Sequence, residues 1–226
     1  GILTTFFSPE PEGNKTPPIS LQEAIWGPLK DYFSRNAAIS LLFLIILYKL
    51  GDAYAGTLTT AFLIRGVGFS PTEVGAINKG LGLISLIIGA IFGGALMVRL
   101  GLFRSLFAFG ILQAVSNLTF VFLAWIGKNY ELFIFAVAFE NLSGGMGTAA
   151  FVSLLMTICN QRYSATQYAL LSSLASLGRI FIAPTSGFLV ESIGWASFFF
   201  ITMLVATPGL WILWSMKDTI SNLKRN

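Results

Sequence analysis

Charged side chains that lie inside long apolar segments are the first candidates for binding or proton transfer in this sequence. Lys49 and Asp52 lie three residues apart, which places them on one helical face and close enough to pair. Glu140, followed by Asn141, lies in a second apolar segment, and Arg179 lies in a third. A charge in the middle of a membrane span costs roughly 2.5–3.5 kcal/mol on insertion scales, so it usually has a partner or a watery cavity. We therefore expect these residues to line a polar cavity that binds a polar solute or carries a proton.

A structural interpretation of the same charges stays open beside the functional one. Lys49 with Asp52, and Glu140 with Arg179, would then be ion pairs that lock helices together. On residue types alone, both interpretations stand.

Other polar residues in the apolar segments have a more ambiguous role. Lys79, with Asn78 before it, is nearer the outer end of its segment, so its long side chain could extend to the membrane surface. Gln113 and Asn117 are one turn apart, and we favour hydrogen bonding between helices for both. The glycine run GGMG at residues 144–147 predicts close helix packing, with a gating hinge as the alternative.

The sequence contains no arrangement typical of an enzyme. It has no histidine and a single cysteine, Cys159, so neither the usual metal ligand nor an internal disulfide is available. No glycine-rich phosphate loop with lysine and no catalytic Ser–His set is present either. We therefore expect no enzymatic activity, no metal and no cofactor, and we expect transport to be driven by an ion gradient.

The apolar segments that carry these residues are predicted to be membrane helices. Hydrophobic residues make up 55% of the chain and charged residues 11%, with a mean hydropathy of +0.77, whereas soluble domains carry about a quarter charged residues. A span needs about 20 mostly apolar residues. We predict six such spans near residues 37–64, 74–98, 103–126, 132–158, 165–190 and 195–216. The fold class is therefore an all-α membrane protein.

The segments outside the spans complete the predicted organisation. Residue 1 is glycine, and the apolar opening at residues 1–7 is interpreted as the end of a preceding transmembrane helix, so we expect the chain to be cut from a longer protein. Residues 8–35 form a Pro-rich linker with an amphipathic helix that suits the membrane interface. Residues 36–216 form the six-helix domain, and residues 217–226 form a polar tail.

The distribution of lysine and arginine predicts the orientation of the chain. Two basic residues, Arg65 and Lys128, fall on one side of the predicted membrane. Nine fall on the other side: Lys15, Lys30, Arg35, Arg99, Arg104, Arg162, Lys217, Lys224 and Arg225. The positive-inside rule then places both termini in the cytoplasm. Basic residues scattered between apolar runs do not suggest nucleic-acid binding.

Several long motifs resemble a known family of membrane transporters. They include GDAYAGTLTTAFLIRGVGFSPTEVGAINK at residues 51–79 and FGILQAVSN at residues 109–117, with further motifs at residues 139–160 and 164–179. These motifs are similar to the AmpG-type muropeptide permeases, a branch of the major facilitator superfamily, over nearly all of the chain after about residue 19. The loop at residues 94–101 resembles the superfamily pattern Gly-x-x-x-Asp-Arg-x-Gly, with Val98 in the place of the Asp.

The resemblance implies a fold and a function. The chain would be the carboxyl-terminal half of a twelve-helix transporter, with the amino-terminal half and the lipid bilayer as partners. The whole protein would be a bacterial inner-membrane permease, driven by protons, that imports anhydromuropeptides from the periplasm for peptidoglycan recycling and β-lactamase induction. The alternatives are a major facilitator transporter of another polar solute (a peptide, amino sugar or drug), or a non-transporting membrane scaffold or sensor.

The resemblance also implies which helices face the central cavity. The first and fourth spans would face it, the second and fifth would flank it, and the third and sixth would pack outside. Gln113 and Asn117, in the third span, would then not line the cavity. Asp52 or Glu140 would take the proton. The residues that would pair with them or bind the substrate are Lys49, Asn78, Lys79, Asn141 and Arg179.

Overall fold

The computed structural model describes residues 21–35 and 37–223 of the chain. Every regular element of this described part is a helix and it contains no strand, so the predicted all-helical fold is confirmed. The helix end expected at residues 1–7, much of the linker and the end of the tail lie outside the described residues.

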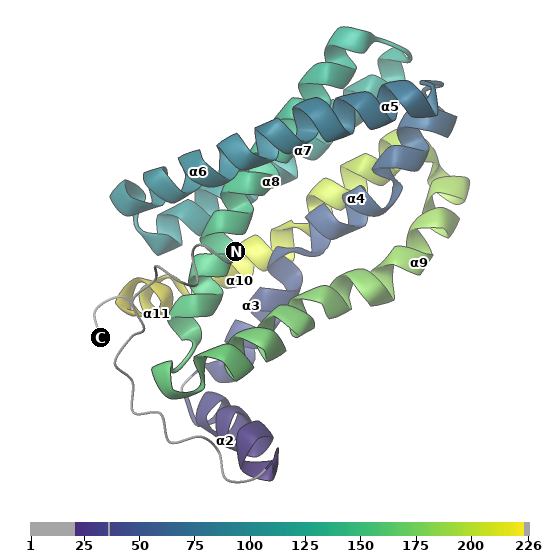
Figure 1. Ribbon diagram of the computed structural model, residues 1–226. Coiled ribbons are helices and arrows are strands. Elements are labelled where there is room, and N and C mark those ends of the chain that lie inside the picture. Colours follow the sequence, from purple (N-terminus) through teal and green to yellow (C-terminus); the bar gives the residue numbers. More distant parts are fainter. Residues whose placement is uncertain (1–20, 36, 224–226) are drawn as a thin grey trace.

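The described helices follow one another with short connections (Figure 1). In chain order they are α2 (Leu21–Phe33), α3 (Ala38–Tyr48), α4 (Leu50–Ala61), the π-helical η1 (Phe62–Gly66), α5 (Pro71–Ile77), the π-helical η2 (Asn78–Gly82), α6 (Leu83–Leu100), α7 (Leu102–Ile126), α8 (Tyr130–Ile158), the 3-10 turn η3 (Gln161–Tyr163), α9 (Ser164–Val205), α10 (Thr207–Ser215) and α11 (Lys217–Asn222).

Five helical stretches among the described residues are long and apolar enough to cross a membrane. The first four correspond to the first four predicted spans. The fifth, Gln161–Ser215, has 55 residues, far more than the 20 or so that one crossing needs. Its helix α9 is broken at Gly194, where φ is 80°, and Figure 1 shows the chain turning back there toward α10. The fifth and sixth predicted spans are therefore the two arms of this stretch.

The two arms of α9 both pack against α4. On the first arm, Thr185 lies 3.1 Å from the hydroxyl of Tyr54, and Gly178 lies so near α4 that a Cβ there would be 2.8 Å from the Leu50 side chain. On the second arm, the carbonyl oxygen of Thr202 approaches Gly51, where an added Cβ would be 2.8 Å away. The small residues let the backbones approach closely, as in other membrane helix pairs.

Glycines also bring α6 and α8 into close contact. A Cβ added to Gly89 would lie 2.1 Å from the carbonyl oxygen of Leu142, and one added to Gly145 would lie 2.2 Å from that of Leu86. Neither position can hold a side chain without separating the two helices. The close packing predicted for the glycine run at residues 144–147 is thus confirmed at Gly145.

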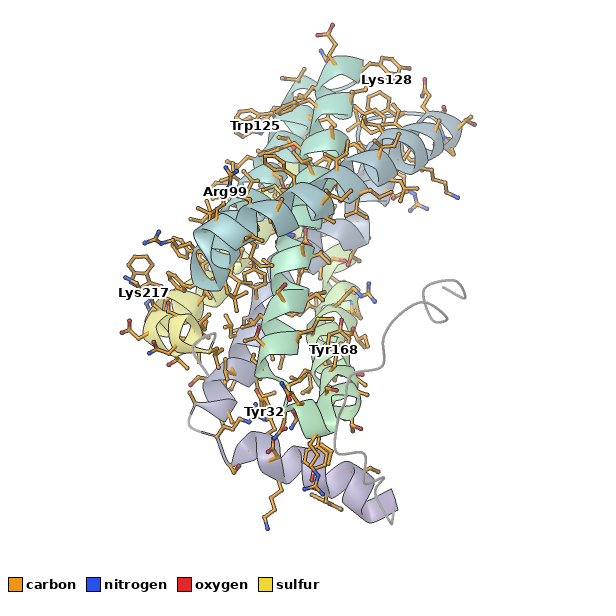
Figure 2. All side chains as sticks on the ribbon, turned by 60° about the vertical axis from the view of Figure 1, so that its left-hand side comes forward. Tyr32, Arg99, Trp125, Lys128, Tyr168 and Lys217 are labelled. Atoms are coloured by element: carbon orange, nitrogen blue, oxygen red, sulfur yellow. The ribbon has the colours of Figure 1, made fainter. Side chains whose placement is uncertain are left out.

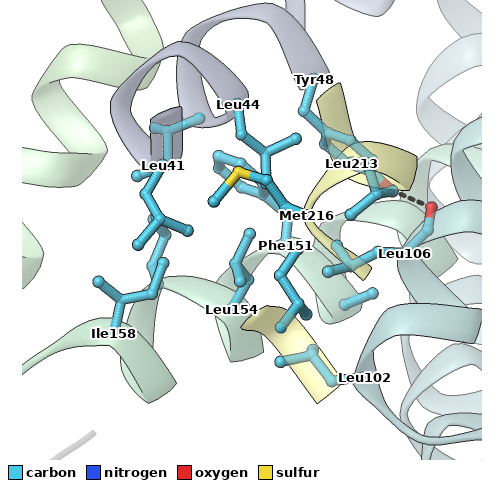
Figure 3. Packing of buried hydrophobic residues seen from close by; sticks show 14 of the residues in the cluster. Leu41, Leu44, Tyr48, Leu102, Leu106, Phe151, Leu154, Ile158, Leu213 and Met216 are labelled. Carbon is cyan, nitrogen blue, oxygen red and sulfur yellow. Dashed lines mark hydrogen bonds between the residues drawn. The ribbon is translucent and has the colours of Figure 1, made fainter. Parts of the chain in front are cut away.

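Two apolar clusters fill the bundle, one toward each end. The linker-side cluster (Figure 3) consists of Tyr32, Ala38, Leu41, Leu44, Ile45, Tyr48, Leu102, Phe103, Leu106, Phe109, Met146, Ala150, Phe151, Leu154, Leu155, Ile158, Leu171, Leu213, Met216 and Ile220. The far-side cluster consists of Tyr54, Ala55, Phe62, Leu63, Phe69, Val74, Phe120, Val121, Leu123, Phe133, Ala136, Val137, Phe198 and Phe199. Lipid tails are as apolar as these side chains, so close packing rather than escape from water holds the helices together.

A polar layer separates the two clusters. The chain passes from one cluster to the other through residues 49–53 at the α3–α4 joint, 110–119 in α7 and 138–145 in α8. These short segments hold most of the polar residues singled out in the sequence. The layer therefore lies near the middle of the helices that cross the bundle.

Helix α2 is attached to the rest of the protein by a closed set of hydrogen bonds, the junction network. The carboxylate of Asp31 accepts from Gln167 Nε2 at 2.8 Å, from Asn160 Nδ2 at 2.8 Å and from Arg35 Nη2 at 2.6 Å. Arg35 also donates to the carbonyl oxygen of Ile158. Gln167 is buried at the start of α9, so the network ties α2 to the α8–α9 connection.

Candidate functional site

A cavity of about 650 Å³ opens in the polar layer between the two apolar clusters. Its walls come from the α3–α4 joint, η2, α6, α8 and the first arm of α9. The structure brings six of the seven predicted site residues to this one cavity: Lys49, Asp52, Asn78, Glu140, Asn141 and Arg179. The polar residues of four separate chain segments therefore meet in one space.

Lys49 lies at the break between α3 and α4, with its ammonium group directed at two partners. Its Nζ atom is 3.5 Å from Asp52 Oδ2 and 3.2 Å from the hydroxyl of Thr148 on α8. About a third of the Asp52 side chain remains exposed, so the carboxylate is within reach of the cavity. The pair predicted from the three-residue spacing is present, and it faces open space.

Gln113 contacts the site, although the third span that carries it was expected to pack outside the cavity. Its Nε2 atom donates to Asp52 Oδ2 at 3.2 Å, so α7 hydrogen-bonds to α4, as we favoured for this residue. Gln113 is buried and fits against Gly147, where an added Cβ would lie 2.2 Å from its Oε1 atom. Asn117 is also buried, but no hydrogen bond from its amide to another helix occurs among the described residues. Gln113 therefore supports the cavity from behind, through Asp52.

Glu140 and Arg179 line the cavity from α8 and α9 without pairing to each other. No ion pair between them occurs among the described residues, and there the Glu140 carboxylate has no hydrogen-bond partner. Glu140 is half-buried, whereas Arg179 is exposed. The ion pair that the structural interpretation requires between these two residues is therefore absent from the described part of the chain.

Two asparagines supply amide groups to the cavity wall. Asn78 begins the π-helical turn η2, a type of irregularity that is frequent at functional sites. Asn141 Nδ2 donates to the Val137 carbonyl oxygen at 2.8 Å within α8, which fixes the direction of its amide. Lys79 does not line the cavity and is exposed, because consecutive helical residues point in different directions.

Hydroxyl groups also line the cavity, and the sequence reasoning missed them. They belong to Thr57, Thr59, Thr60, Thr148 and Ser176. Threonine inside a membrane helix commonly bonds to its own backbone, as Thr57 and Thr59 do here, so threonine alone is a weak signal of a site. The four-residue stretch TLTT at 57–60, one turn after Asp52, is the signal that could have found them.

Comparison with known proteins shows which family and which proteins this chain resembles. The profile of the Major Facilitator Superfamily matches residues 1–180 and 41–225. The chain is 50% identical over 225 residues to the anhydromuropeptide permease of Escherichia coli (strain K12), covering 100% of this chain and 46% of that protein. It is 36% identical over 208 residues to the putative transporter AmpG 4 of Rickettsia felis, covering 92% of this chain and 50% of that protein. The chain spans about half the length of these relatives.

Proposed function

Since this chain belongs to the major facilitator superfamily, we propose that it forms the carboxyl-terminal half of a proton-coupled transporter that imports anhydromuropeptides. The observation that carries the proposal is that one cavity, at mid-depth in apolar helices, gathers six of the seven predicted site residues. Secondary transporters bind their substrates near the bilayer midplane, between two halves. The E. coli relative is named an anhydromuropeptide permease, which supplies the substrate class.

The chemistry of the cavity suits a sugar–peptide fragment. Such a fragment presents carboxylates, amides and hydroxyls. Lys49 and Arg179 are the cations that hold a carboxylate, and the planar guanidinium of Arg179 suits a bidentate contact. Asn78 and Asn141, with the threonine hydroxyls, hydrogen-bond the sugar and peptide groups. The transporter performs no chemical conversion, so none of these groups acts as a catalyst.

The two partners of Asp52, Lys49 and Gln113, support the proposed proton coupling. While Asp52 is ionised, Lys49 and Gln113 are engaged with it. Protonation of Asp52 removes the counter-ion of Lys49, which is then available to a substrate carboxylate. Glu140 is a second candidate for the proton, since no cation holds its carboxylate among the described residues. Proton and substrate binding then favour each other at one site.

The second half of the transporter completes the cavity and provides alternating access. We place the protein in the bacterial inner membrane with both termini in the cytoplasm. The support is the basic character of the linker side, where Lys30, Arg35, Arg99, Arg104, Arg162 and Lys217 are the described contributors. Import in this direction supplies peptidoglycan recycling and the signals that induce β-lactamase.

Uptake by the complete transporter tests the proposed function. Right-side-out membrane vesicles would receive labelled anhydromuropeptide with and without an inward proton gradient. We expect accumulation that needs the gradient and that unlabelled anhydromuropeptide, but not a free dipeptide or amino sugar, suppresses. No accumulation in either condition would reject the substrate. Equal suppression by a dipeptide would favour a transporter of another polar solute.

A further inference from the structure

A second cavity, of about 530 Å³, lies at the linker-side end of the bundle and has no lining residue in common with the first. It forms where α6 turns into α7 and where α10 turns into α11, and we call it the end groove. The end groove plays no part in the proposed transport cavity, so its residues need a separate explanation.

Two cations line the end groove without a counter-ion. Arg104 and Lys217 are both exposed, and among the described residues no carboxylate lies within ion-pair distance of either. Asp218 follows Lys217 in the chain but does not line the groove. Arg99, just before the α6–α7 turn, is a third exposed cation, and Figure 2 shows it on the same side of the molecule as Lys217. The end groove is therefore positively charged.

The start of α7 adds to this positive field. Its first turn, including Arg104, lines the end groove, and no side chain caps it, because Gly101 stands at the N-cap position. The first N–H groups of a helix have no partner within the helix, and they favour a nearby anion.

Three aromatic side chains also line the end groove: Phe103, Phe107 and Trp214. The rings of Phe107 and Trp214 lie 5.2 Å apart, and those of Phe103 and Trp214 lie 6.2 Å apart. Lys217 Nζ is 5.8 Å from the Trp214 ring, so charge and aromatic surface meet within one site. Trp214 is 56% exposed, and Trp211, one turn earlier on α10, is 73% exposed. The cations thus stand at the edge of an apolar surface that belongs to membrane-crossing helices.

We propose that the end groove binds the headgroup of an anionic phospholipid. Arg104 and Lys217 contact the phosphate, Ser221 offers a hydroxyl to the headgroup, and Phe107 and Trp214 cover the first part of the acyl chains. Basic pockets between membrane helices on the cytoplasmic side suit such headgroups. A free phosphate would use the cations alone and leave the exposed tryptophan without a role. The site goes beyond the proposed transport function and does not depend on which solute is carried.

Lipid binding to the complete purified transporter tests the proposal. Native mass spectrometry would count bound phosphatidylglycerol and bound phosphatidylcholine for the wild type and for the double variant Arg104→Gln/Lys217→Gln. The matched control is Lys30→Gln/Arg162→Gln, which removes two exposed cations of the same side that lie outside the end groove. We expect the groove variant to lose at least one phosphatidylglycerol, with about a tenfold weaker affinity, and the control to keep it.

Three results would overturn the proposal. Equal loss of phosphatidylglycerol in the control would mean that overall charge, not the end groove, attracts the lipid. Equal retention of phosphatidylcholine by the wild type would mean that the site does not select anionic headgroups. Displacement of the lipid by millimolar inorganic phosphate would identify a free-anion site instead.

Fluorescence gives a readout that does not rely on charge. Brominated phosphatidylglycerol quenches tryptophans that its acyl chains touch, so the difference between wild type and Trp214→Phe isolates the contribution of Trp214. We expect brominated phosphatidylglycerol to quench the Trp214 fluorescence in the wild type and to leave it unchanged in Arg104→Gln/Lys217→Gln. Quenching of Trp214 that persists in the double variant would contradict the assigned binding mode.

Discussion

Two groups of polar side chains in this molecule are arranged in opposite ways. In the junction network, Asp31 of α2 accepts hydrogen bonds from three side chains, which lie just after α2, in the α8–α9 connection and in α9. At the cavity of the polar layer, the carboxylate of Asp52 pairs only with Lys49 and Gln113 among the described residues, and the Glu140 carboxylate has no hydrogen-bond partner there. A satisfied network fixes an element in place, whereas an unsatisfied one keeps capacity for a ligand or a proton. Under the proposed function, the contrast distinguishes charges that hold the fold together from charges that bind substrate or a proton.

The largest expected effect comes from the cavity. Lys49→Gln removes the only cation within ion-pair distance of Asp52 among the described residues. It should lower gradient-driven uptake about a hundredfold, because a hydrogen bond to a charged group is worth about 1.5–3 kcal/mol. Uptake per molecule of protein in the membrane is the measurement. Lys30→Gln, an exposed cation on α2, is the control and should transport normally. Uptake by Lys49→Gln within twofold of wild type would remove Lys49 from the mechanism.

A smaller effect, on stability and not on coupling, is expected at the junction network. Asp31→Asn loses the charge that Arg35 and two amides bind and should destabilise the attachment of α2 by about 2 kcal/mol. Thermal unfolding of the complete transporter in detergent measures this, with the exposed Asp218→Asn as control. Proton coupling should be unchanged. A loss of coupling with an unchanged Tm would show that the two groups are not separate.

The same network should respond to acid. Burial raises the pKa of Asp31, but the hydrogen bonds from Gln167, Asn160 and Arg35 outweigh it and hold the pKa below its usual value of 3.8. Stability from the ionised Asp31 is then complete above the usual pKa and is lost as the pH falls through the lower, folded-state value. The difference in Tm between wild type and Asp31→Asn should shrink between pH 5 and about pH 3. A difference that stays constant over this range would contradict the assignment.

The smallest effect is expected where α7 supports the cavity. Gln113→Leu removes one hydrogen bond to Asp52 and should lower uptake about threefold to fivefold. Gln113→Glu keeps the size but sets a second carboxylate beside Asp52, so its loss should be larger. Equal losses in the two variants would indicate a packing role only, set by the fit of Gln113 against Gly147.

Local patterns predicted the helices and most of the cavity. Apolar runs of about 20 residues defined the spans, and the three-residue spacing of Lys49 and Asp52 defined their pair. The charges of α8 and α9 also met at the cavity, because family geometry assigned their helices to it. The spans and the Lys49–Asp52 pair depend on residues that are close in the sequence, and the family resemblance supplied the arrangement of the helices.

Contacts that depend on how helices rotate against one another were not predictable. Gln113 can reach Asp52 because Gly147, 34 positions further along the chain, has no side chain and leaves room for the Gln113 amide. Whether Glu140 meets Arg179 depends on the separation of α8 and α9, and the junction network joins Asp31 to residues more than 120 positions away. No periodicity in the sequence specifies such long-range distances.

Accumulation and exchange, measured in the same vesicles, test whether the cavity carboxylates couple transport to protons. The variants are Asp52→Asn and Glu140→Gln, with Glu131→Gln as control because it is an exposed carboxylate at the start of α8. We predict that at least one of the cavity variants loses gradient-driven accumulation more than tenfold. That variant should still exchange labelled for unlabelled substrate, and the control should behave as wild type. Full gradient-driven accumulation in both cavity variants would contradict the account.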